Sequence, residues 1–329
     1  MALTGMALTG ATPQQLRGAS SLEELYGHLA TIDVGPGWAK VTPSLYPSPK
    51  KKFPPAIWHY IQAKAALDAA GRLINTELAE RRNLILMNVG AGSSYATSAT
   101  LVSAYQMIMP GEHARSHRHT PNALRLIVDA EPGTYTVVDG VRLEMMPGDV
   151  LLTPNWCWHG HGNDGQANGY WIDFLDVPLV HMLEPMFFEP YPDEYEKGER
   201  PTSPSPMHFP WVETKQRLAA ARPGPGGIHG TQIEFGNPAM ATTALFMMKF
   251  APGEATTPYR TTANNLYSPV EGEGETIVEG KSFAWQRGDV LVVPSWLAHF
   301  HRSEKGAVLF RVTDEPAMSK LGFLRDERQ

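Results

Sequence analysis

The sequence predicts an all-β chain that consists of two similar barrels behind an N-terminal segment with helices. From about residue 105 onward, short runs of β-forming residues are separated by Gly, Pro and Asp, a texture typical of sandwiches and barrels. The second half of this region repeats the first, because the triplet PGE at 110–112 recurs at 252–254 and GDV at 148–150 recurs at 288–290. Two copies of one β unit make a two-barrel chain the simplest architecture.

The composition excludes several classes of protein. With 42% hydrophobic and 19% charged residues among 329, the chain can bury a large core and is not expected to be disordered. A formal net charge of -6 provides no basic field for nucleic acid or an anionic membrane, and no apolar run approaches the ~18 residues of a spanning helix. The N-terminus lacks a secretory signal pattern, and the single cysteine, Cys157, excludes an intrachain disulfide, so we expect a cytoplasmic protein. The repeated MALTG at 1–5 and 6–10 is set aside as a start-site duplication or a cloning artefact.

The N-terminal segment, 1–82, is expected to contain helices. Its best helical candidate runs from Ala56 to Arg82, where Ala, Leu, Glu and Arg are frequent. The first barrel is expected at 83–189 and opens with a short strand at 84–87. Its clearest further strands are expected at 124–128, 134–138, 150–153 and 170–174.

A connector at 190–227 is expected to separate the first barrel from the second, which occupies 228–329. The connector contains eight prolines and a charged stretch at 193–200, so no packed element is expected there. The β texture resumes near residue 242 and continues to about residue 313.

The histidines form three His-x-His pairs, at 117/119, 159/161 and 299/301. Residues i and i+2 of a strand point to the same face, so each pair can place two imidazoles on one interior wall of a barrel. Imidazoles in this arrangement suit a first-row divalent metal. Hydrogen-bonded histidines of the surface or core are the alternative, but pairs at equivalent strand ends of a repeated fold favour a metal site.

Two spaced motifs resemble those of the cupin superfamily. They are Gly111-x5-His117-x-His119 and Gly148-x5-Pro154-x-Trp156-x2-His159-x3-Asn163. The resemblance implies that His117, His119 and His159 are metal ligands. The usual first motif also supplies a Glu ligand, but Ala123 and Leu124 occupy the corresponding places. The implied site therefore has three neutral imidazoles and no carboxylate.

A closer resemblance covers nearly the whole chain from about residue 75. Segments such as PGEHARSHRHTPNALRLIV, PGDVLLTPNWCWHGHGN, WIDFLDVPLV and HFPWVETKQRL are similar to the gentisate 1,2-dioxygenase family, which includes salicylate and 1-hydroxy-2-naphthoate dioxygenases. The resemblance implies a bicupin with Fe(II) on three histidines and a homotetramer. It also implies O2-dependent fission of an aromatic ring between its carboxylated and hydroxylated carbons.

The substrate carboxylate needs a cationic partner, and the planar fork of Arg suits it. In the family, the Arg of the ALR stretch binds this carboxylate, which implies that role for Arg125. Arg125 lies six residues after His119, and this even separation returns it to the same face if the strand is regular. Arg81 resembles a second anion-binding Arg of the family, with the adjacent Arg82 as the alternative.

Three further residues complete the expected site. His161 shares the inward face of His159, and the resemblance implies that it bonds the substrate or dioxygen and relays protons, with a fourth ligand or a structural histidine as alternatives. Asp173, in WID, is expected to orient His161 or a ligand imidazole, or else to be solvated. Gln106 is a candidate polar group lining the pocket.

The second barrel departs from the metal pattern. Aligned from PGE, Tyr259 and Thr261 fall where His117 and His119 lie, so only the 299/301 pair persists. Two His and a Tyr can in principle hold a metal, but a site usually needs three good ligands. We therefore expect this barrel to be metal-free, with a role in packing and subunit contact.

The expected function is Fe(II)-dependent ring fission of a salicylate-type acid: gentisate, salicylate, a substituted salicylate or 1-hydroxy-2-naphthoate. Pro121 and Asn122 replace the Gln-Ser familiar in gentisate enzymes, which favours a salicylate or naphthoate relative or a broad-specificity enzyme. One alternative is another metal-dependent cupin enzyme, a decarboxylase or isomerase, although these typically keep the Glu ligand. The other is a non-enzymatic bicupin for storage or ligand sensing, although such proteins often lose the histidine set.

Overall fold

The computed structural model describes residues 9–40, 44–79, 81–198, 205–236 and 240–328. The chain divides into two compact units, 1–50 and 51–329. The first unit contains α1 (Pro13–Gly18), α2 (Leu22–Ala30) and η1 (Gly37–Ala39). Thr12 and Ser21 cap α1 and α2, because their side chains accept backbone N–H groups of the first turn. In the described residues, no helix is long and apolar enough to cross a membrane.

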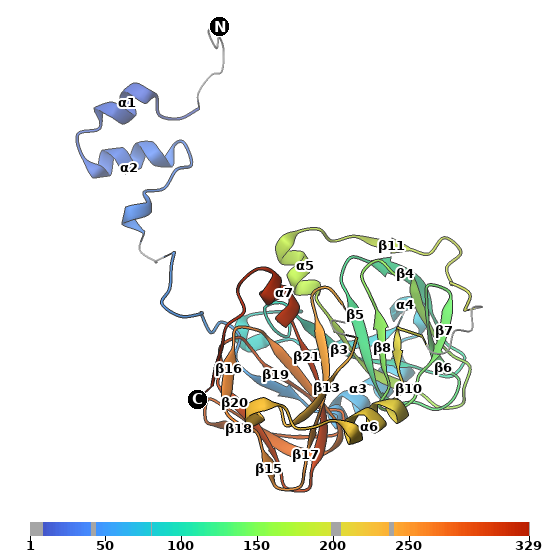
Figure 1. Cartoon of the computed structure of the whole chain (residues 1–329). Helices are drawn as coiled ribbons and strands as arrows, with labels where there is room; N and C mark the ends of the chain where they lie inside the picture. The colour runs from blue at the N-terminus through green and yellow to red at the C-terminus, as the bar shows by residue number, and fades with distance from the viewer. Residues whose placement is uncertain (1–8, 41–43, 80, 199–204, 237–239, 329) are drawn as a thin grey trace. The chain divides into compact units, whose positions relative to one another are not determined.

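The first barrel is formed by two antiparallel sheets (Figure 1). The order is β12-β8-β5-β10-β3-β2 in one sheet and β11-β4-β9-β6-β7 in the other. Their strands are β2 (Arg82–Ile85), β3 (Val102–Ile108), β4 (His113–His119), β5 (Ala123–Asp129), β6 (Thr134–Val138), β7 (Val141–Glu144), β8 (Val150–Thr153), β9 (His159–Asn163), β10 (Gly169–Leu175), β11 (Phe188–Pro190) and β12 (His208–Phe209). The strands predicted from the sequence are confirmed to within one or two residues at each end.

The second barrel is an eleven-stranded sheet with the main order β13-β14-β21-β17-β20-β16-β22. The long strand β17 (Asn265–Val278) pairs with β19 and β21 through its first part and with β18 and β20 through its second, so it connects the two walls. The other strands are β1 (Ala56–Trp58), β13 (Thr231–Glu234), β14 (Ala244–Phe250), β15 (Glu254–Ala255), β16 (Tyr259–Thr261), β18 (Lys281–Gln286), β19 (Val290–Val293), β20 (His299–Ser303), β21 (Ala307–Thr313) and β22 (Asp326–Arg328). The all-β fold is thus confirmed, while the exact domain boundaries stay a prediction.

Two segments differ from their predicted secondary structure. The helix expected from Ala56 begins only at Tyr60, because residues 56–58 form β1 and pair with β19. The segment 190–227 contains a helix, α6 (Trp211–Ala220), which buries Thr214 and Leu218. The remaining helices are α3 (Tyr60–Leu73), α4 (Thr76–Ala79), η2 (Val89–Ala91), α5 (Val177–Leu183), η3 (Pro225–Gly227) and α7 (Glu315–Lys320).

Each of these two segments, β1–α3 and β12–α6, contacts both barrels, and we call them the arms. β1 joins the second barrel, whereas the following α3 contacts β2 and β3 of the first. Conversely, β12 joins the first barrel, whereas α6 contacts β13 and β14 of the second. The arms also share one apolar core with both barrels, since the largest buried cluster contains Tyr60 and Leu67 of α3 and Leu218 of α6 as well as residues of β5, β10, β14 and β21.

The Asp of the repeated GDV motif forms hydrogen bonds with each arm. The carboxylate of Asp289 accepts the backbone N–H of Tyr60 at 2.9 Å and contacts Nδ1 of His59 at 2.9 Å. In the other half, Asp149 accepts the backbone N–H of Trp211 at 2.7 Å and contacts a histidine Nε2 at 2.8 Å. Each acidic residue therefore satisfies a backbone N–H at the N-terminal end of an arm helix, so the repeated motif has the same role in both barrels.

Candidate metal centre

Adjacent strands bring three histidines together inside the first barrel. His117 and His119 lie on β4, and His159 lies on β9 directly opposite His117. Their ligand atoms all lie within 4.8 Å of one another, and no other group of His, Cys, Asp and Glu among the described residues meets this criterion. The i,i+2 spacing on β4 places both imidazoles on the same side, as predicted.

Each of the three rings is oriented by a backbone carbonyl two residues away. Nδ1 lies 3.2 Å from the carbonyl oxygen in His117, 2.8 Å in His119 and 3.1 Å in His159. A proton on Nδ1 that is donated to this carbonyl leaves Nε2 as the lone-pair nitrogen, which is the form that binds a metal. The backbone therefore selects the tautomer required of a ligand.

Burial keeps these imidazoles neutral. It lowers the pKa of His117 to about 3, helped by the positive charge of Arg81, and it lowers the pKa of His119. Burial and the neighbouring rings lower the pKa of His159 well below its ordinary value. Three neutral nitrogen donors in a buried cluster fit a first-row divalent ion, whose 2+ charge they leave uncompensated.

A buried polar network lies across β5, β10 and β3. Arg125, 1% exposed, places Nε 3.4 Å from Oδ1 of Asp173 and donates from Nη1 to Oγ1 of Thr136 at 3.0 Å. The other carboxylate oxygen of Asp173 accepts a hydrogen bond from Nε2 of Gln106. The positive charge of the guanidinium also contributes to lowering the pKa of His117.

Two expectations about this network need correction. Arg125 and His119 do not share a strand, because β4 ends at His119 and β5 begins at Ala123 in the other sheet, so even spacing does not explain why Arg125 points inward. Asp173 has different partners from those expected: it bonds to Arg125 and Gln106 rather than to an imidazole. The reason is the register of β5 and β10, which sets Arg125 directly opposite Asp173.

The two neighbouring arginines have different environments. Arg82 makes a bidentate ion pair with Glu112, with Nη1 2.6 Å from Oε2 and Nη2 2.8 Å from Oε1. It also donates to the carbonyl oxygen of Ile74. Arg81 precedes it, and its charge contributes to lowering the pKa values of His117 and His161. Since Arg82 is held by structural partners, the arrangement favours Arg81 as the arginine beside the cluster.

His161 carries a buried polar atom that is not hydrogen-bonded. The residue is 4% exposed, and within the described residues its Nδ1 has no hydrogen-bond partner. The same holds for Oε1 of Gln106. Buried polar groups are normally paired, so two orphaned atoms beside a candidate metal cluster indicate a place where a bound molecule completes the bonding. Burial and the charge of Arg125 lower the pKa of His161 well below its ordinary value.

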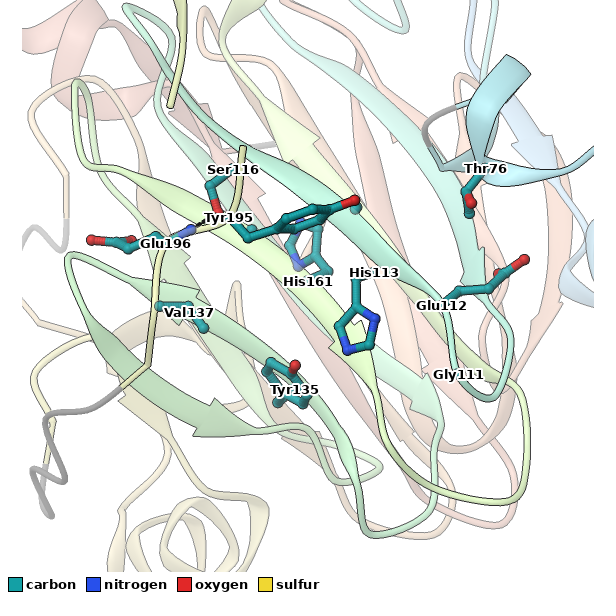
Figure 2. Close-up of a pocket in the computed structure, with 12 residues that line it drawn as sticks. Thr76, Gly111, Glu112, His113, Ser116, Tyr135, Val137, His161, Tyr195 and Glu196 are labelled. Atoms are coloured by element: carbon teal, nitrogen blue, oxygen red, sulfur yellow. Dashed lines mark hydrogen bonds between the residues drawn. The ribbon is translucent and has the colours of Figure 1, made fainter. Parts of the chain in front are cut away.

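A cavity of about 510 Å³ lies against the five-stranded sheet and also borders His161 (Figure 2). Tyr135 and Val137 line it, whereas Thr136 between them bonds to the buried Arg125, so the cavity lies on the outer face of β6. Its rim includes His113 and Tyr195, whose ring centroids are 6.4 Å apart. The cavity does not include the three clustered histidines among its lining residues.

The corresponding position in the second barrel contains tyrosines. The hydroxyl of Tyr267 lies 2.9 Å from Nε2 of His299 and 3.3 Å from the hydroxyl of Tyr259. Nδ1 of His301 lies 2.8 Å from Oγ1 of Thr276. The nitrogen with which His299 would bind a metal is therefore hydrogen-bonded to a tyrosine.

Comparison with known proteins assigns the family. Residues 104–175 match the cupin-domain family. The chain is 34% identical to gentisate 1,2 dioxygenase 1 of Aquipseudomonas alcaligenes, across 93% of this chain and 96% of the relative. The chain belongs to this 1,2-dioxygenase family.

The chain is also similar to other members of the 1,2-dioxygenase family. The chain is 35% identical to 5-aminosalicylate 1,2-dioxygenase of a Comamonas species, covering 94% of this chain and 90% of the relative. The crystal structure of salicylate 1,2-dioxygenase from Pseudaminobacter salicylatoxidans superimposes with a TM-score of 0.85 at 30% identity, covering 94% of this chain and 97% of that one. The family resemblance seen in the sequence motifs is thus confirmed.

Sequence reasoning missed two residues next to the cluster. The ring centroid of Phe188, on β11, lies 5.1 Å from that of His117, although the two are far apart in the chain. Arg118, between His117 and His119 on β4, stacks on the tryptophans of the β8–β9 loop. The repeat provided a signal for Arg118, since Arg260 occupies the same place in the second copy, but no local pattern indicates Phe188.

Proposed function

We propose that this protein is an Fe(II)-dependent ring-fission dioxygenase for a salicylate-type acid. It cleaves the ring between the carboxylated and hydroxylated carbons and incorporates both atoms of O2. The observation that carries this proposal is the all-histidine cluster of His117, His119 and His159, which has no carboxylate ligand and lies beside a buried arginine. The names of its relatives, gentisate and 5-aminosalicylate dioxygenases, agree with this substrate class.

The charge of the site explains why the substrate is an ortho-hydroxy acid. Three neutral imidazoles leave a divalent ion with an uncompensated 2+ charge, which is unfavourable in a buried position. A carboxylate and a neighbouring phenolate can together neutralise this charge and chelate the ion. Iron, when bound by His117, His119 and His159, supplies the redox chemistry that allows dioxygen to react with the aromatic ring.

The chain's own residues bind and orient the substrate. Arg125 donates to Asp173 through Nε and to Thr136 through Nη1, and its second terminal nitrogen, Nη2, is proposed to contact the substrate carboxylate. Arg81 adds a second positive charge, and Oε1 of Gln106 offers an acceptor for a substrate hydroxyl.

His161 is proposed to hold and transfer the proton of the substrate hydroxyl. Burial keeps the imidazole neutral in the free site, so Nδ1 can accept a hydrogen bond from the substrate hydroxyl. The negative charge of the bound carboxylate would raise the pKa of His161 again and so favour proton transfer as the phenol ionises. Asp173 acts indirectly, because its carboxylate holds both Arg125 and Gln106 in place.

The test is an oxygen-uptake assay after anaerobic loading with Fe(II). The substrates are gentisate, salicylate, 5-aminosalicylate and 1-hydroxy-2-naphthoate, with benzoate as the control that lacks the hydroxyl. We expect one O2 consumed per molecule cleaved for at least one ortho-hydroxy acid and none for benzoate. Iron-loaded protein that consumes no oxygen with any of the four acids would exclude the proposal.

We further propose that the protein forms a homotetramer and is located in the cytoplasm. The family resemblance supports the assembly, and the presence of a single cysteine agrees with a reducing compartment. Size measurement by light scattering tests the assembly.

A further inference from the structure

Arg118 joins the two segments that carry the metal ligands. It lies between His117 and His119 on β4, so its side chain points away from theirs. Its guanidinium carbon lies 4.6 Å from the ring centroid of Trp156 and 4.4 Å from that of Trp158. Both tryptophans belong to the loop that leads directly into His159, and both contacts lie within cation–π range.

The same guanidinium also holds β11. Arg118 donates to Oε2 of Glu189 from Nε at 2.7 Å and places a terminal nitrogen 2.6 Å from it, and the two residues lie opposite each other in the β4–β11 register. The neighbouring Phe188 places its ring 5.1 Å from the His117 ring. One side chain therefore contacts the His159 loop on one side and the strand that borders the cluster on the other.

The loop that Arg118 contacts has a strained backbone. Trp156 has a φ of 65°, which is uncommon for a residue with a bulky side chain. Its backbone N–H donates to the carbonyl of His119 at 3.0 Å, and the N–H of Trp158 donates to Oδ1 of Asp139 at 2.8 Å. A strained conformation persists only where surrounding contacts enforce it, so the stacked guanidinium helps to keep this loop in place.

The second barrel contains a simpler version of the same arrangement. Arg260 lies 4.6 Å from the ring centroid of Trp296 and pairs with Glu327 on β22 at 2.6 Å. Trp296 likewise has a positive φ, 63°. Ala298, however, stands where Trp158 stands in the first barrel. The barrel with the histidine cluster is therefore the one in which the guanidinium contacts two tryptophans.

We propose that Arg118 is a positioning residue that holds the His159 loop against the strand of His117 and His119. A metal site requires its ligands to be held within a fraction of an ångström, and the groups behind the ligands provide this rigidity. Arg118 also holds β11, so that Phe188 stays beside the cluster. The effect on substrate binding rests on the proposed function, whereas the effect on metal binding does not.

The test compares Arg118→Met with Arg260→Met. Methionine keeps much of the side-chain volume but removes the charge and the planar group. We expect R118M to bind Fe(II) about 10- to 100-fold more weakly than the parent in anaerobic competition with a chelator. R260M is expected to retain the parent affinity. Both variants should lower the thermal midpoint of the metal-free protein by a few degrees, about 2–4 °C, which measures the purely structural contribution.

Two more variants separate the parts of the arrangement. Arg118→Lys keeps the charge but cannot stack between two indoles or present a fork, so it should recover only part of the affinity. Glu189→Gln releases β11 and should raise the KM for the aromatic acid more than it weakens Fe(II) binding. It also serves as the test of the β11 contact should R118M fail to fold.

Three results would overturn the proposal. One is parent-like Fe(II) affinity in folded R118M, and another is an equal loss in R118M and R260M, which would show a general stability effect. The third is complete rescue by lysine, which would show that charge alone matters. The Fe(II) titration needs no substrate, so its outcome stands even if the oxygen-uptake assay excludes the proposed ring fission.

Discussion

Arg125 and Asp173 lie directly opposite each other on β5 and β10, with Nε 3.4 Å from Oδ1 and both side chains almost fully buried. The pair fixes the guanidinium in place, and the same carboxylate also accepts a hydrogen bond from Gln106. A buried pair of this kind is costly to break from one side, because the remaining charge is left without a partner. Arg125 therefore serves both the fold and the proposed substrate contact.

Replacement of Arg125 with Met should affect turnover and stability together. Loss of the carboxylate contact should lower kcat/KM by roughly 30- to several thousand-fold, equivalent to about 2–5 kcal/mol. Leaving Asp173 unpaired should lower the free energy of unfolding by about 3–5 kcal/mol. The double variant R125M/D173N should recover part of the stability but none of the turnover. Normal iron content with near-normal kcat/KM in R125M would exclude Arg125 as the carboxylate partner.

Equivalent histidines of the two barrels should differ in their effect on metal content. His159→Ala should abolish iron retention and ring fission, because two imidazoles do not hold Fe(II) against water in an open site. His299→Ala should leave one ion per chain, since Nε2 of His299 is bonded to the Tyr267 hydroxyl. Metal analysis of the parent and both variants measures the number of ions bound per chain. A second ion in the parent that resists mild chelation would contradict the expectation of a metal-free second barrel.

The metal-free protein should lose stability as the pH falls below about 6.5. Burial lowers the pKa of His117 to about 3 and that of His299 to about 4, whereas both titrate near 6.5 in the unfolded chain. The unfolded state therefore binds protons first, and stability is complete above pH 6.5 and declines below it. At pH 5 each of these two histidines should lower the free energy of unfolding by about 2 kcal/mol. Denaturant unfolding at pH 7.5 and pH 5 measures the change, and equal values would contradict the burial of neutral imidazoles.

The carboxylates of Asp149 and Asp289, which bind the two arms, should stabilise the folded protein to a similar extent. Asp149→Asn and Asp289→Asn each weaken bonds to a helix N-terminus and a histidine, and each should lower the free energy of unfolding by about 1.5–3 kcal/mol. The double variant should show nearly additive losses, because the two sites share no partner. Iron content should not change. A large loss of iron in either variant would show that the arms act on the metal site as well.

Local pattern was sufficient for the strands and for placing His117 and His119 on one face. That placement follows from the two-residue period of a strand, and the repeat of PGE and GDV required two copies of one β unit. His159 was identified through the resemblance of its motif, and it reaches His117 through the pairing of β4 with β9. Local pattern could not predict that Arg125 and Gln106 belong to one hydrogen-bonded network. Their shared partner Asp173 depends on the register of three strands, which is set by pairing between distant segments.

The sequence by itself determined the two-barrel all-β fold and the family, because strand periodicity and motif spacing are local properties. Only the tertiary structure decided that residues 56–58 form a strand in the second barrel, that Arg82 is held by Glu112, and that Arg118 joins two ligand segments. In each case the deciding partner lies on another strand or loop, at a separation in the chain that no periodicity encodes. The stability of such contacts comes from burial and pairing in the folded barrel, which exist only once the distant segments meet.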